Sequence, residues 1–161
     1  MNIIEYRPIG LIHTPFEKAE GTPIQPTALG SAAAVVEIFP EYTEGLADLD
    51  GFSHIILLYH LHKSRPCSLR VKPFLDDKMH GLFATRAPSR PNAIGLSVVR
   101  LAKMEGSRLY IEEADMLDET PLLDIKPYVP DFDVREVQKT GWFADAPGKL
   151  EKARDDGRFS R

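Results

Sequence analysis

The sequence predicts a mainly β protein, an antiparallel barrel or sandwich with short helices rather than a helix-flanked parallel sheet. Three observations lead to this prediction. Short runs rich in Val, Ile, Leu and aromatic residues recur along the chain, separated by turn residues. Thirteen prolines are spread over the 161 residues, which disfavours long helices. The eleven glycines form neither G-x-G-x-x-G nor G-x-x-x-x-G-K-[ST], so a Rossmann dinucleotide site and a P-loop are both unsupported.

Eight runs have the composition of β-strands. They cover residues 8–13, 34–39, 52–62, 68–73, 81–85, 94–104, 109–113 and 123–128. Between 94–104 and 108–113 lies the sequence Glu105-Gly106-Ser107, which predicts a hairpin with the glycine in the turn. Residues 40–49 are expected to hold one short helix. The charged tail, residues 148–161, is expected to be helical or frayed.

Composition bounds the class of protein. With 43% hydrophobic and 27% charged residues, the chain has the make-up of one globular domain. No stretch approaches 18 unbroken apolar residues, and the first residues lack the apolar core of a secretory signal. The single cysteine, Cys67, excludes an internal disulfide and a multi-cysteine metal site. We therefore expect a cytoplasmic protein without membrane contact.

Charge is distributed unevenly along the chain. Residues 55–108 contain ten Lys or Arg and three acids, a net charge of +7. Because the whole chain has a net charge of −4, the other residues together carry −11. A basic segment in an acidic protein is a candidate surface for a polyanion such as nucleic acid. The alternative is a solvated surface whose cations pair within the molecule.

Four segments differ from ordinary core. Residues 21–27 form a loop stiffened by two prolines, which is either a rigid connector or part of a site. His54, His60 and His62 share one parity, so a strand would present them on one face. They could form a metal site, but no other Cys, Asp or Glu is placed to complete it, so we favour polar contacts and predict no metal.

The other two segments concentrate polar groups. Residues 81–95 present arginines on a loop fixed by prolines, and the planar guanidinium suits carboxylate or phosphate. Residues 115–130 place carboxylates, a lysine and a tyrosine beside a proline-constrained strand. Such groups can hold a cationic ligand or transfer a proton, although a turn with local side-chain caps would have the same composition.

Two long motifs in these segments resemble a known family. The first is G-x-F-A-T-R-x-P-x-R-P-N-x-I-G-x-S over residues 81–97, and the second is D-x-T-P-x-x-D-I-K-P-Y over residues 118–128. The opening I-G-x-I-x-x-P at 9–15 and the F-S-H at 52–54 are also similar. Together they resemble the TsaA-like (TrmO) family of S-adenosylmethionine-dependent tRNA methyltransferases. The resemblance covers about residues 5–130, within a single domain of residues 1–161, and leaves 131–161 as a C-terminal tail.

The resemblance implies a small β-barrel that binds S-adenosylmethionine without a Rossmann fold. It also implies a homodimer with the cofactor near the subunit interface. The family reaction methylates N6 of threonylcarbamoyladenosine at position 37 of certain tRNAs. By the same resemblance, twelve residues would contact the cofactor: Gln25, Pro26, Thr27, Ala28, His62, Lys63, Arg86, Leu96, Asp118, Glu119, Thr120 and Pro121. Arg90, Pro91 and Asn92 would shape the same pocket.

The chain departs from the family pattern in two ways. Glu119 stands where the family usually has glycine, which is tolerable unless this position needs a positive φ. Bacterial members often carry an extra C-terminal domain, whereas this chain ends about thirty residues after the second motif. Its absence leads us to expect either a different RNA substrate or a protein that only binds cofactor.

Methyl transfer from a sulfonium mainly requires positioning, but the N6 nitrogen must also lose a proton. The sequence hypothesis makes Asp124 or Tyr128 the base, with Lys126 as an electrostatic partner. A loop adenine can be splayed out and stacked on an aromatic ring, for which Phe83 and Tyr128 are the candidates. Arg65, Arg70, Lys72, Phe83, Arg90 and Asn92 are the predicted RNA-binding residues.

Two other functions remain open at this point. A non-enzymatic barrel that senses the cofactor or a nucleotide, and acts through a partner, agrees with the missing C-terminal domain. A metal-dependent hydrolase built on the histidines lacks carboxylate ligands at useful spacing. The basic segment and the polar motifs favour the methyltransferase.

Overall fold

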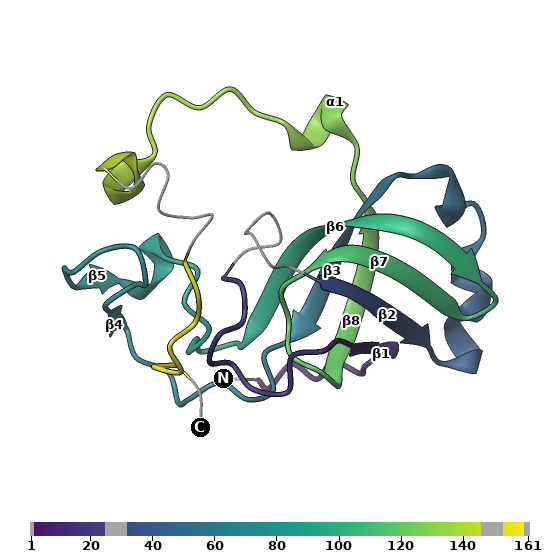
Figure 1. The fold of residues 1–161 in the computed structure, drawn as a ribbon, viewed down its shortest axis with the longest axis horizontal. Coiled ribbons are helices and arrows are strands. Elements are labelled where there is room, and N and C mark those ends of the chain that lie inside the picture. Colours follow the sequence, from purple (N-terminus) through teal and green to yellow (C-terminus); the bar gives the residue numbers. More distant parts are fainter. Residues whose placement is uncertain (1, 25–31, 146–152, 160–161) are drawn as a thin grey trace.

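The computed structural model describes residues 2–24, 32–145 and 153–159. Figure 1 shows a curved barrel and a smaller lobe beside it, with the C-terminal part of the chain passing from one to the other. The described residues include no helix that is both long and apolar enough to cross a membrane.

Six antiparallel strands close the barrel. They are β1 (Gly10–His13), β2 (Ala32–Ile38), β3 (His54–His60), β6 (Ile94–Glu105), β7 (Arg108–Ala114) and β8 (Thr120–Pro127). Their order around the barrel is β1-β2-β7-β6-β3-β8, and β8 returns to pair with β1. Closure leaves no strand edge unpaired, which protects a small sheet from edge-to-edge association. The predicted mainly β fold is confirmed, and so is the small antiparallel barrel that the family resemblance implied.

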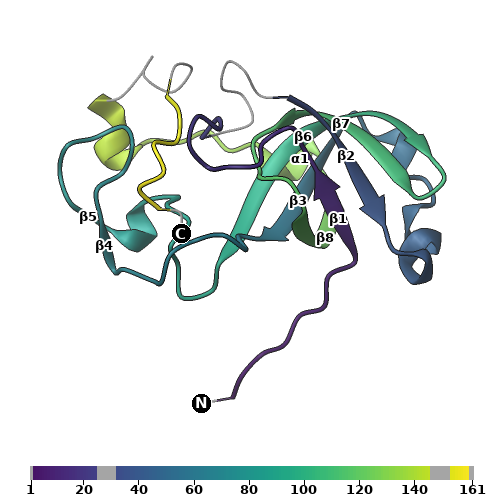
Figure 2. The same ribbon diagram turned by 60° about the horizontal axis from the view of Figure 1, so that its bottom comes forward.

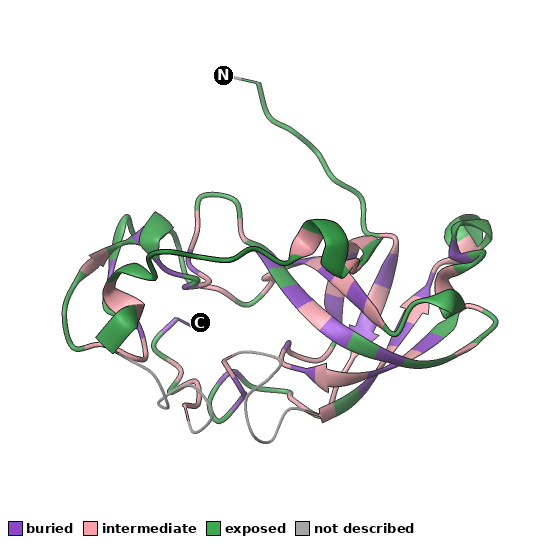
Figure 3. Ribbon diagram, turned by 90° about the horizontal axis from the view of Figure 1, so that it is seen from above, coloured by how far each residue is buried: buried purple, intermediate pink, exposed green. Residues whose placement is uncertain are grey.

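The core follows the alternation of the strands. In β3, residues at odd positions are buried, and Ile55 and Leu57 are fully inaccessible to solvent. Partners from the other strands complete one apolar cluster, including Ile12, Val36 and Leu122. Figure 3 shows the alternation as bands of buried and more exposed residues along the strands. Because every second side chain points inward, six short strands suffice to fill the barrel.

Local signals predicted the connections within the barrel well. The hairpin between β6 and β7 forms as expected, with Gly106 at φ +59 in its turn and Glu105 opposite Arg108. The short helix expected in residues 40–49 is the 3-10 helix η1 (Pro40–Leu46), which begins with proline. A further 3-10 turn, η2 (Leu49–Gly51), leads into β3.

The smaller lobe contains β4 (Arg70–Val71), β5 (His80–Gly81) and the 3-10 turn η3 (Leu82–Ala84). The prediction of a strand over 81–85 is wrong beyond Gly81. The chain turns there because Leu82 packs inward, in a second apolar cluster with Val71, Ala87 and Phe159. A loop with its own small core can hold irregular backbone that a sheet would not.

The C-terminal part of the chain runs back across the molecule. After α1 (Pro130–Asp133) and η4 (Gly141–Asp145), residues 153–159 contain an isolated β-bridge and a turn and are tied to the rest of the protein rather than helical or frayed, so that prediction is wrong where the tail is described. Arg154 pairs with Pro23 in an isolated bridge, and Phe159 is buried. Figure 2 shows this segment lying between the N-terminal loop and the lobe. Burial of Phe159 and the backbone hydrogen bonds of Asp155 with Gly21 and Thr22 hold the segment in place.

Gly10 tests the closure of the barrel. A Cβ at this position would lie 2.3 Å from the carbonyl oxygen of Glu37 on β2, and backbone cannot yield as a flexible side chain does. We expect Gly10→Ala to lower the free energy of unfolding by about 1–3 kcal/mol, measured by urea denaturation. The matched control is Gly45→Ala, where the added Cβ meets nothing within 4 Å. Equal stability of the two variants would contradict the close approach of β1 and β2.

Candidate functional site

A cavity of about 900 Å³ lies between one end of the barrel and the smaller lobe. Its walls come from segments far apart in the sequence: the end of β3, the start of β6, the loop that precedes β8, loop 82–90 and two stretches of the C-terminal part of the chain. Both sequence motifs therefore contribute to one space.

A chain of three polar side chains stands where the barrel core meets this cavity. The Ser97 hydroxyl donates to Asp115 Oδ1 at 2.7 Å, and the Tyr59 hydroxyl lies 2.9 Å from Ser97 Oγ. A serine hydroxyl has a single hydrogen, so Tyr59 is the donor to Ser97. Tyr59 and Ser97 are buried, whereas Asp115 is half-buried and lines the cavity.

Burial is the largest influence on the pKa values of Asp115 and Tyr59. It raises the pKa of Asp115 to about 7, although the Ser97 hydrogen bond and the Arg86 charge act in the opposite direction. It also raises the pKa of Tyr59, with the nearby Asp115 carboxylate as the second cause, so Tyr59 stays a neutral donor.

Loop 82–90 presents Arg86 to the cavity and uses Arg90 for its own structure. The Arg90 guanidinium donates through Nη1 to the carbonyl oxygens of Thr85 at 3.0 Å and Ala87 at 3.2 Å. It also lies 5.8 Å from the centre of the Phe83 ring. Arg90 lines the cavity, but these hydrogen bonds to the loop backbone show that its guanidinium stabilises the loop. Phe83 is 74% exposed at the same wall, which suits a stacking surface.

His62 and Lys63 enter the cavity just after β3 ends. His62 Nε2 is buried and has no hydrogen-bond partner among the described residues, while its Nδ1 lies 3.5 Å from the Thr120 hydroxyl. Burial and the Lys63 charge lower the pKa of His62, so its ring is neutral near pH 7. Lys63 donates to the carbonyl oxygen of Glu17 at 3.2 Å. Buried polar atoms without a hydrogen-bond partner are rare in folded proteins, so this ring nitrogen stands out at the cavity wall.

The turn 118–121 contributes only in part. Asp118 Oδ1 accepts the Thr14 backbone N–H at 3.0 Å, so this carboxylate secures the end of β1. Thr120 lines the cavity and donates to the carbonyl oxygen of Leu117 at 2.7 Å. Glu119 has φ +59, the left-handed conformation in which a side chain is strained. Position 119 does need a positive φ, so the glycine usual in the family has a physical reason.

Of the side chains proposed as catalytic, two lie farther along β8 and the third, Tyr128, directly follows it. Asp124, Lys126 and Tyr128 are not among the residues that line the cavity. Asp124 Oδ2 lies 2.7 Å from Lys126 Nζ, and Asp124 Oδ1 accepts the Ile125 backbone N–H. Tyr128 contacts the His54 ring edge to face. Four predicted cofactor residues, Gln25, Pro26, Thr27 and Ala28, lie outside the described residues.

The family model for the N-terminal domain of tRNA-methyltransferase O matches residues 11–134. The chain belongs to this family. A Pyrococcus abyssi protein named as a probable S-adenosyl-L-methionine-binding protein is 56% identical over 157 residues, 98% of this chain and 85% of that protein. The tRNA (adenine(37)-N6)-methyltransferase of Mus musculus is 40% identical over 133 residues, 78% of this chain.

Solved structures agree with this assignment. A crystal structure of TrmO from Pseudomonas aeruginosa superposes with a TM-score of 0.73 at 37% sequence identity, over 88% of this chain. The match covers 63% of the Pseudomonas chain and 31% of the mouse enzyme. The common part is therefore the family's barrel domain with its motifs.

The cavity extends beyond the family model. Trp142, Phe143 and Phe159 lie after residue 134 and still line it. Trp142 Nε1 donates to the carbonyl oxygen of Ala84 at 2.7 Å, and its ring stacks on His80 with centroids 4.8 Å apart. Sequence reasoning missed this wall. The one available signal was that Trp142 is the only tryptophan of the chain.

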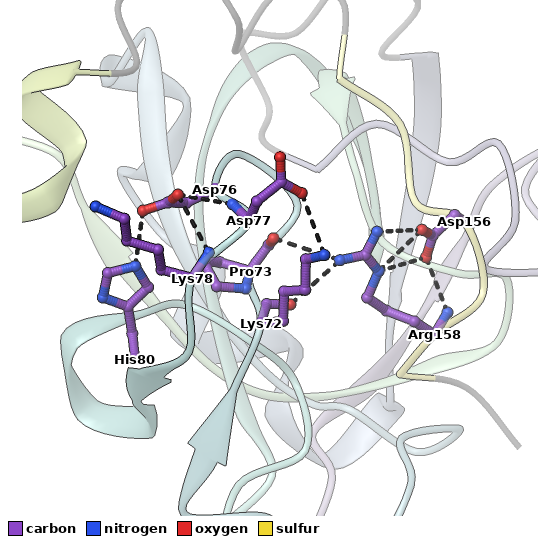
Figure 4. A network of polar contacts seen from close by, with 8 residues as sticks. All are labelled: Lys72, Pro73, Asp76, Asp77, Lys78, His80, Asp156 and Arg158. Carbon is purple, nitrogen blue, oxygen red and sulfur yellow. Dashed lines mark hydrogen bonds and ion pairs between the residues drawn. The ribbon is translucent and has the colours of Figure 1, made fainter.

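Polar contacts attach the lobe to the C-terminal part of the chain, as Figure 4 shows. Arg158 donates to the carbonyl oxygens of Lys72 at 3.3 Å and Pro73 at 3.4 Å, and it forms an ion pair with Asp156. Lys72 Nζ lies 3.1 Å from Asp77. The predicted RNA-binding residues Arg65, Arg70 and Asn92 are exposed. Within the described residues, no three His, Cys, Asp or Glu side chains gather in a way that could hold a metal.

Glu119 provides a test of the turn. We expect Glu119→Gly to raise the free energy of unfolding by up to about 1 kcal/mol, because glycine adopts φ +59 without strain. Glu119→Val should lower it by about 1 kcal/mol or more, because a β-branched residue is strained there. Urea denaturation of both variants beside wild type decides. Equal stability of the glycine and valine variants would mean that the turn is not left-handed.

Proposed function

We propose that this chain is an S-adenosylmethionine-dependent methyltransferase that methylates N6 of the adenine at tRNA position 37, with threonylcarbamoyladenosine as the acceptor. The observation that carries the proposal is the convergence of both family motifs on one cavity that offers charges of both signs. The mouse relative is named for this reaction on adenine 37, and the Pyrococcus relative for cofactor binding.

The cavity fits the cofactor in size and in chemistry. At about 900 Å³ it can take a ligand of this size and leave room for a base. Arg86 and Lys63 suit the cofactor carboxylate, and the half-buried Asp155 adds negative charge beside a cationic ligand. His62 adds a polar ring to the same lining. Leu96, 52% exposed on the same wall, adds apolar surface.

When bound, the cofactor supplies an electrophilic methyl group on a sulfonium. The chain's own residues hold the acceptor in line with it, and this positioning accounts for most of the catalysis. Phe83 at the cavity wall stacks against the acceptor adenine once that base is splayed out of its loop. Asp118, Glu119 and Pro121 shape the turn that brings Thr120 to the cavity, and Gln25 to Ala28 form the remaining cofactor contacts. No metal takes part in this scheme.

We also propose a cytoplasmic homodimer. One subunit offers limited surface for an anticodon arm, and a two-fold axis would double the exposed cations of the small lobe. Arg65, Arg70 and Lys72 bind tRNA phosphates, with Asn92 beside the cavity, while Arg90 supports the loop on which the RNA rests.

The deciding experiment incubates methyl-labelled cofactor with total tRNA that contains threonylcarbamoyladenosine. We expect label in tRNA, located at adenine 37 by mass spectrometry of nuclease digests. Arg86→Ala should weaken cofactor binding by about 1.5–3 kcal/mol in calorimetry, because a charge-assisted hydrogen bond is lost. Lys103→Ala, an exposed change on β6 away from the cavity, is the control. Cofactor binding without label in tRNA would instead favour a non-enzymatic sensor.

The contribution of phosphate contacts can be measured separately. Each neutralised phosphate contact releases counterions, so tRNA affinity should fall steeply as salt rises. Joint replacement of Arg65, Arg70 and Lys72 by alanine should reduce the slope of log affinity against log salt by the amount that up to about three phosphate contacts contribute. Cofactor binding should stay unchanged. The control triple variant replaces Arg100, Lys103 and Arg108, on the hairpin away from the lobe (Figure 1). The assignment of the lobe fails if both triple variants flatten the slope equally.

A further inference from the structure

The Asp115 carboxyl is the group at the cavity that the proposed function leaves without a defined task. We propose that Asp115 accepts the N6 proton of the acceptor adenine during methyl transfer, an inference that rests on the proposed function. Asp124 and Tyr128, the bases that the sequence suggested, lie outside the lining of the cavity. Asp124 is also engaged with Lys126.

The barrel holds this carboxyl in place. Its Oδ1 accepts from Ser97, whose oxygen in turn accepts from Tyr59, so the hydrogen-bond chain Tyr59 to Ser97 to Asp115 runs from the core to the cavity. Tyr59 is 6% and Ser97 2% exposed, whereas Asp115 is half-buried. A carboxylate has two oxygens that accept, so anchoring Oδ1 fixes the direction of the group without exhausting it.

The register of β3 and β6 makes this chain possible. Tyr59 lies opposite Gly95, and a Cβ at Gly95 would come within 2.2 Å of the Tyr59 ring. Gly95 therefore lets the ring lie flat over β6 and bring its hydroxyl to Ser97, two residues farther along the same face. In the I-G-x-S part of the first motif, Gly95 thus makes room for the Tyr59 ring, and Ser97 connects the Tyr59 hydroxyl to the Asp115 carboxyl by hydrogen bonds.

The chemistry requires an acceptor for one proton. As the nitrogen lone pair forms the N–CH₃ bond, the S–CH₃ bond breaks and its electrons remain on sulfur, leaving a neutral thioether. The N6 proton passes to the Asp115 carboxylate, which becomes a neutral carboxylic acid. A base is most effective when its pKa lies near the working pH, and burial raises that of Asp115 to about 7.

The neighbouring charged groups come from several elements. Arg86 on loop 82–90 lowers the pKa of Asp115, and neutral Tyr59 faces it from β3. His62 and Lys63 after β3, and Asp155 from the C-terminal part, line the same cavity. Asp155 Oδ1 accepts the Gly157 backbone N–H at 2.7 Å within its own loop, whereas Asp115 is held by Ser97 of the barrel.

Asp115→Asn tests the proposal. We expect single-turnover methylation of tRNA, at saturating cofactor, to slow by about 10²–10⁴-fold, the usual contribution of a general base. Cofactor affinity in calorimetry should stay within about threefold of wild type. In wild type the rate should rise with pH up to about 7 and then level, because only the ionised carboxylate accepts a proton. The variant should lose this rise.

Two further variants keep the test decisive. Ser97→Ala retains the carboxylate but removes a hydrogen bond that lowers its pKa, so the rising limb should move to higher pH even if Asp115→Asn folds poorly. Glu112→Gln, an exposed carboxylate three residues earlier that pairs with Arg100, is the matched control and should leave the profile unchanged.

Several results would overturn the proposal. One is an Asp115→Asn enzyme that methylates at the wild-type rate with the wild-type pH limb. A second is a loss confined to cofactor affinity, with normal turnover at saturation, which would make Asp115 a cofactor contact. An unmoved limb in Ser97→Ala is a third. These outcomes all require wild type to label tRNA, whereas a wild type that binds cofactor and labels nothing overturns the proposed function itself, and this inference with it.

Discussion

The contact between the Tyr59 ring and the backbone of Gly95 is the constraint on which the site depends. In most of the barrel, inward side chains are aliphatic and fill the space between strands. At this end a large ring lies over a strand that has no side chain to oppose it. The ring belongs to the apolar core, and its hydroxyl is hydrogen-bonded to the polar side chains at the cavity. Core and site are thus joined by one residue, so the site inherits the rigidity of the β3–β6 pairing.

The lobe has a different basis for its stability. Its two strands are each two residues long and could not persist alone. The apolar cluster of Val71, Leu82 and Ala87 is completed by Phe159, from the other end of the chain. Arg158 and Trp142 add hydrogen bonds to the carbonyl oxygens of the same lobe. The loop that carries Arg86 is consequently ordered by residues beyond the family domain, and the shape of the cavity depends on both.

Sequence reasoning succeeded where the signal was local. The β6–β7 hairpin follows from alternation and from Gly106, both readable within twenty residues. The barrel required more, because alternation does not say whether a sheet closes. The docking of the tail was missed because Phe159 is buried by residues more than seventy positions earlier in the chain, and no periodicity records such a contact. Position in the fold likewise separates Asp115 from Asp118 and Asp124, three carboxylates that look alike in one short segment, because of the three only Asp115 lines the cavity.

The two motifs divide their residues between shape and chemistry, which explains why motif membership alone assigns roles poorly. In the first motif, Arg90 donates hydrogen bonds to carbonyl oxygens of its own loop. The charge of Arg86, four residues earlier, instead acts on the Asp115 carboxyl at the cavity. In the second, Asp118 anchors β1 and Glu119 accepts a strained backbone, and only Thr120 reaches the cavity. An arginine or a carboxylate in a motif can serve either purpose, and what decides is whether neighbouring backbone groups satisfy it first. Loops of irregular backbone have many unpaired carbonyl and amide groups, so they require such supporting side chains in greater number than strands do. Many residues of these two motifs are therefore required because they support the irregular backbone of two loops around the cavity.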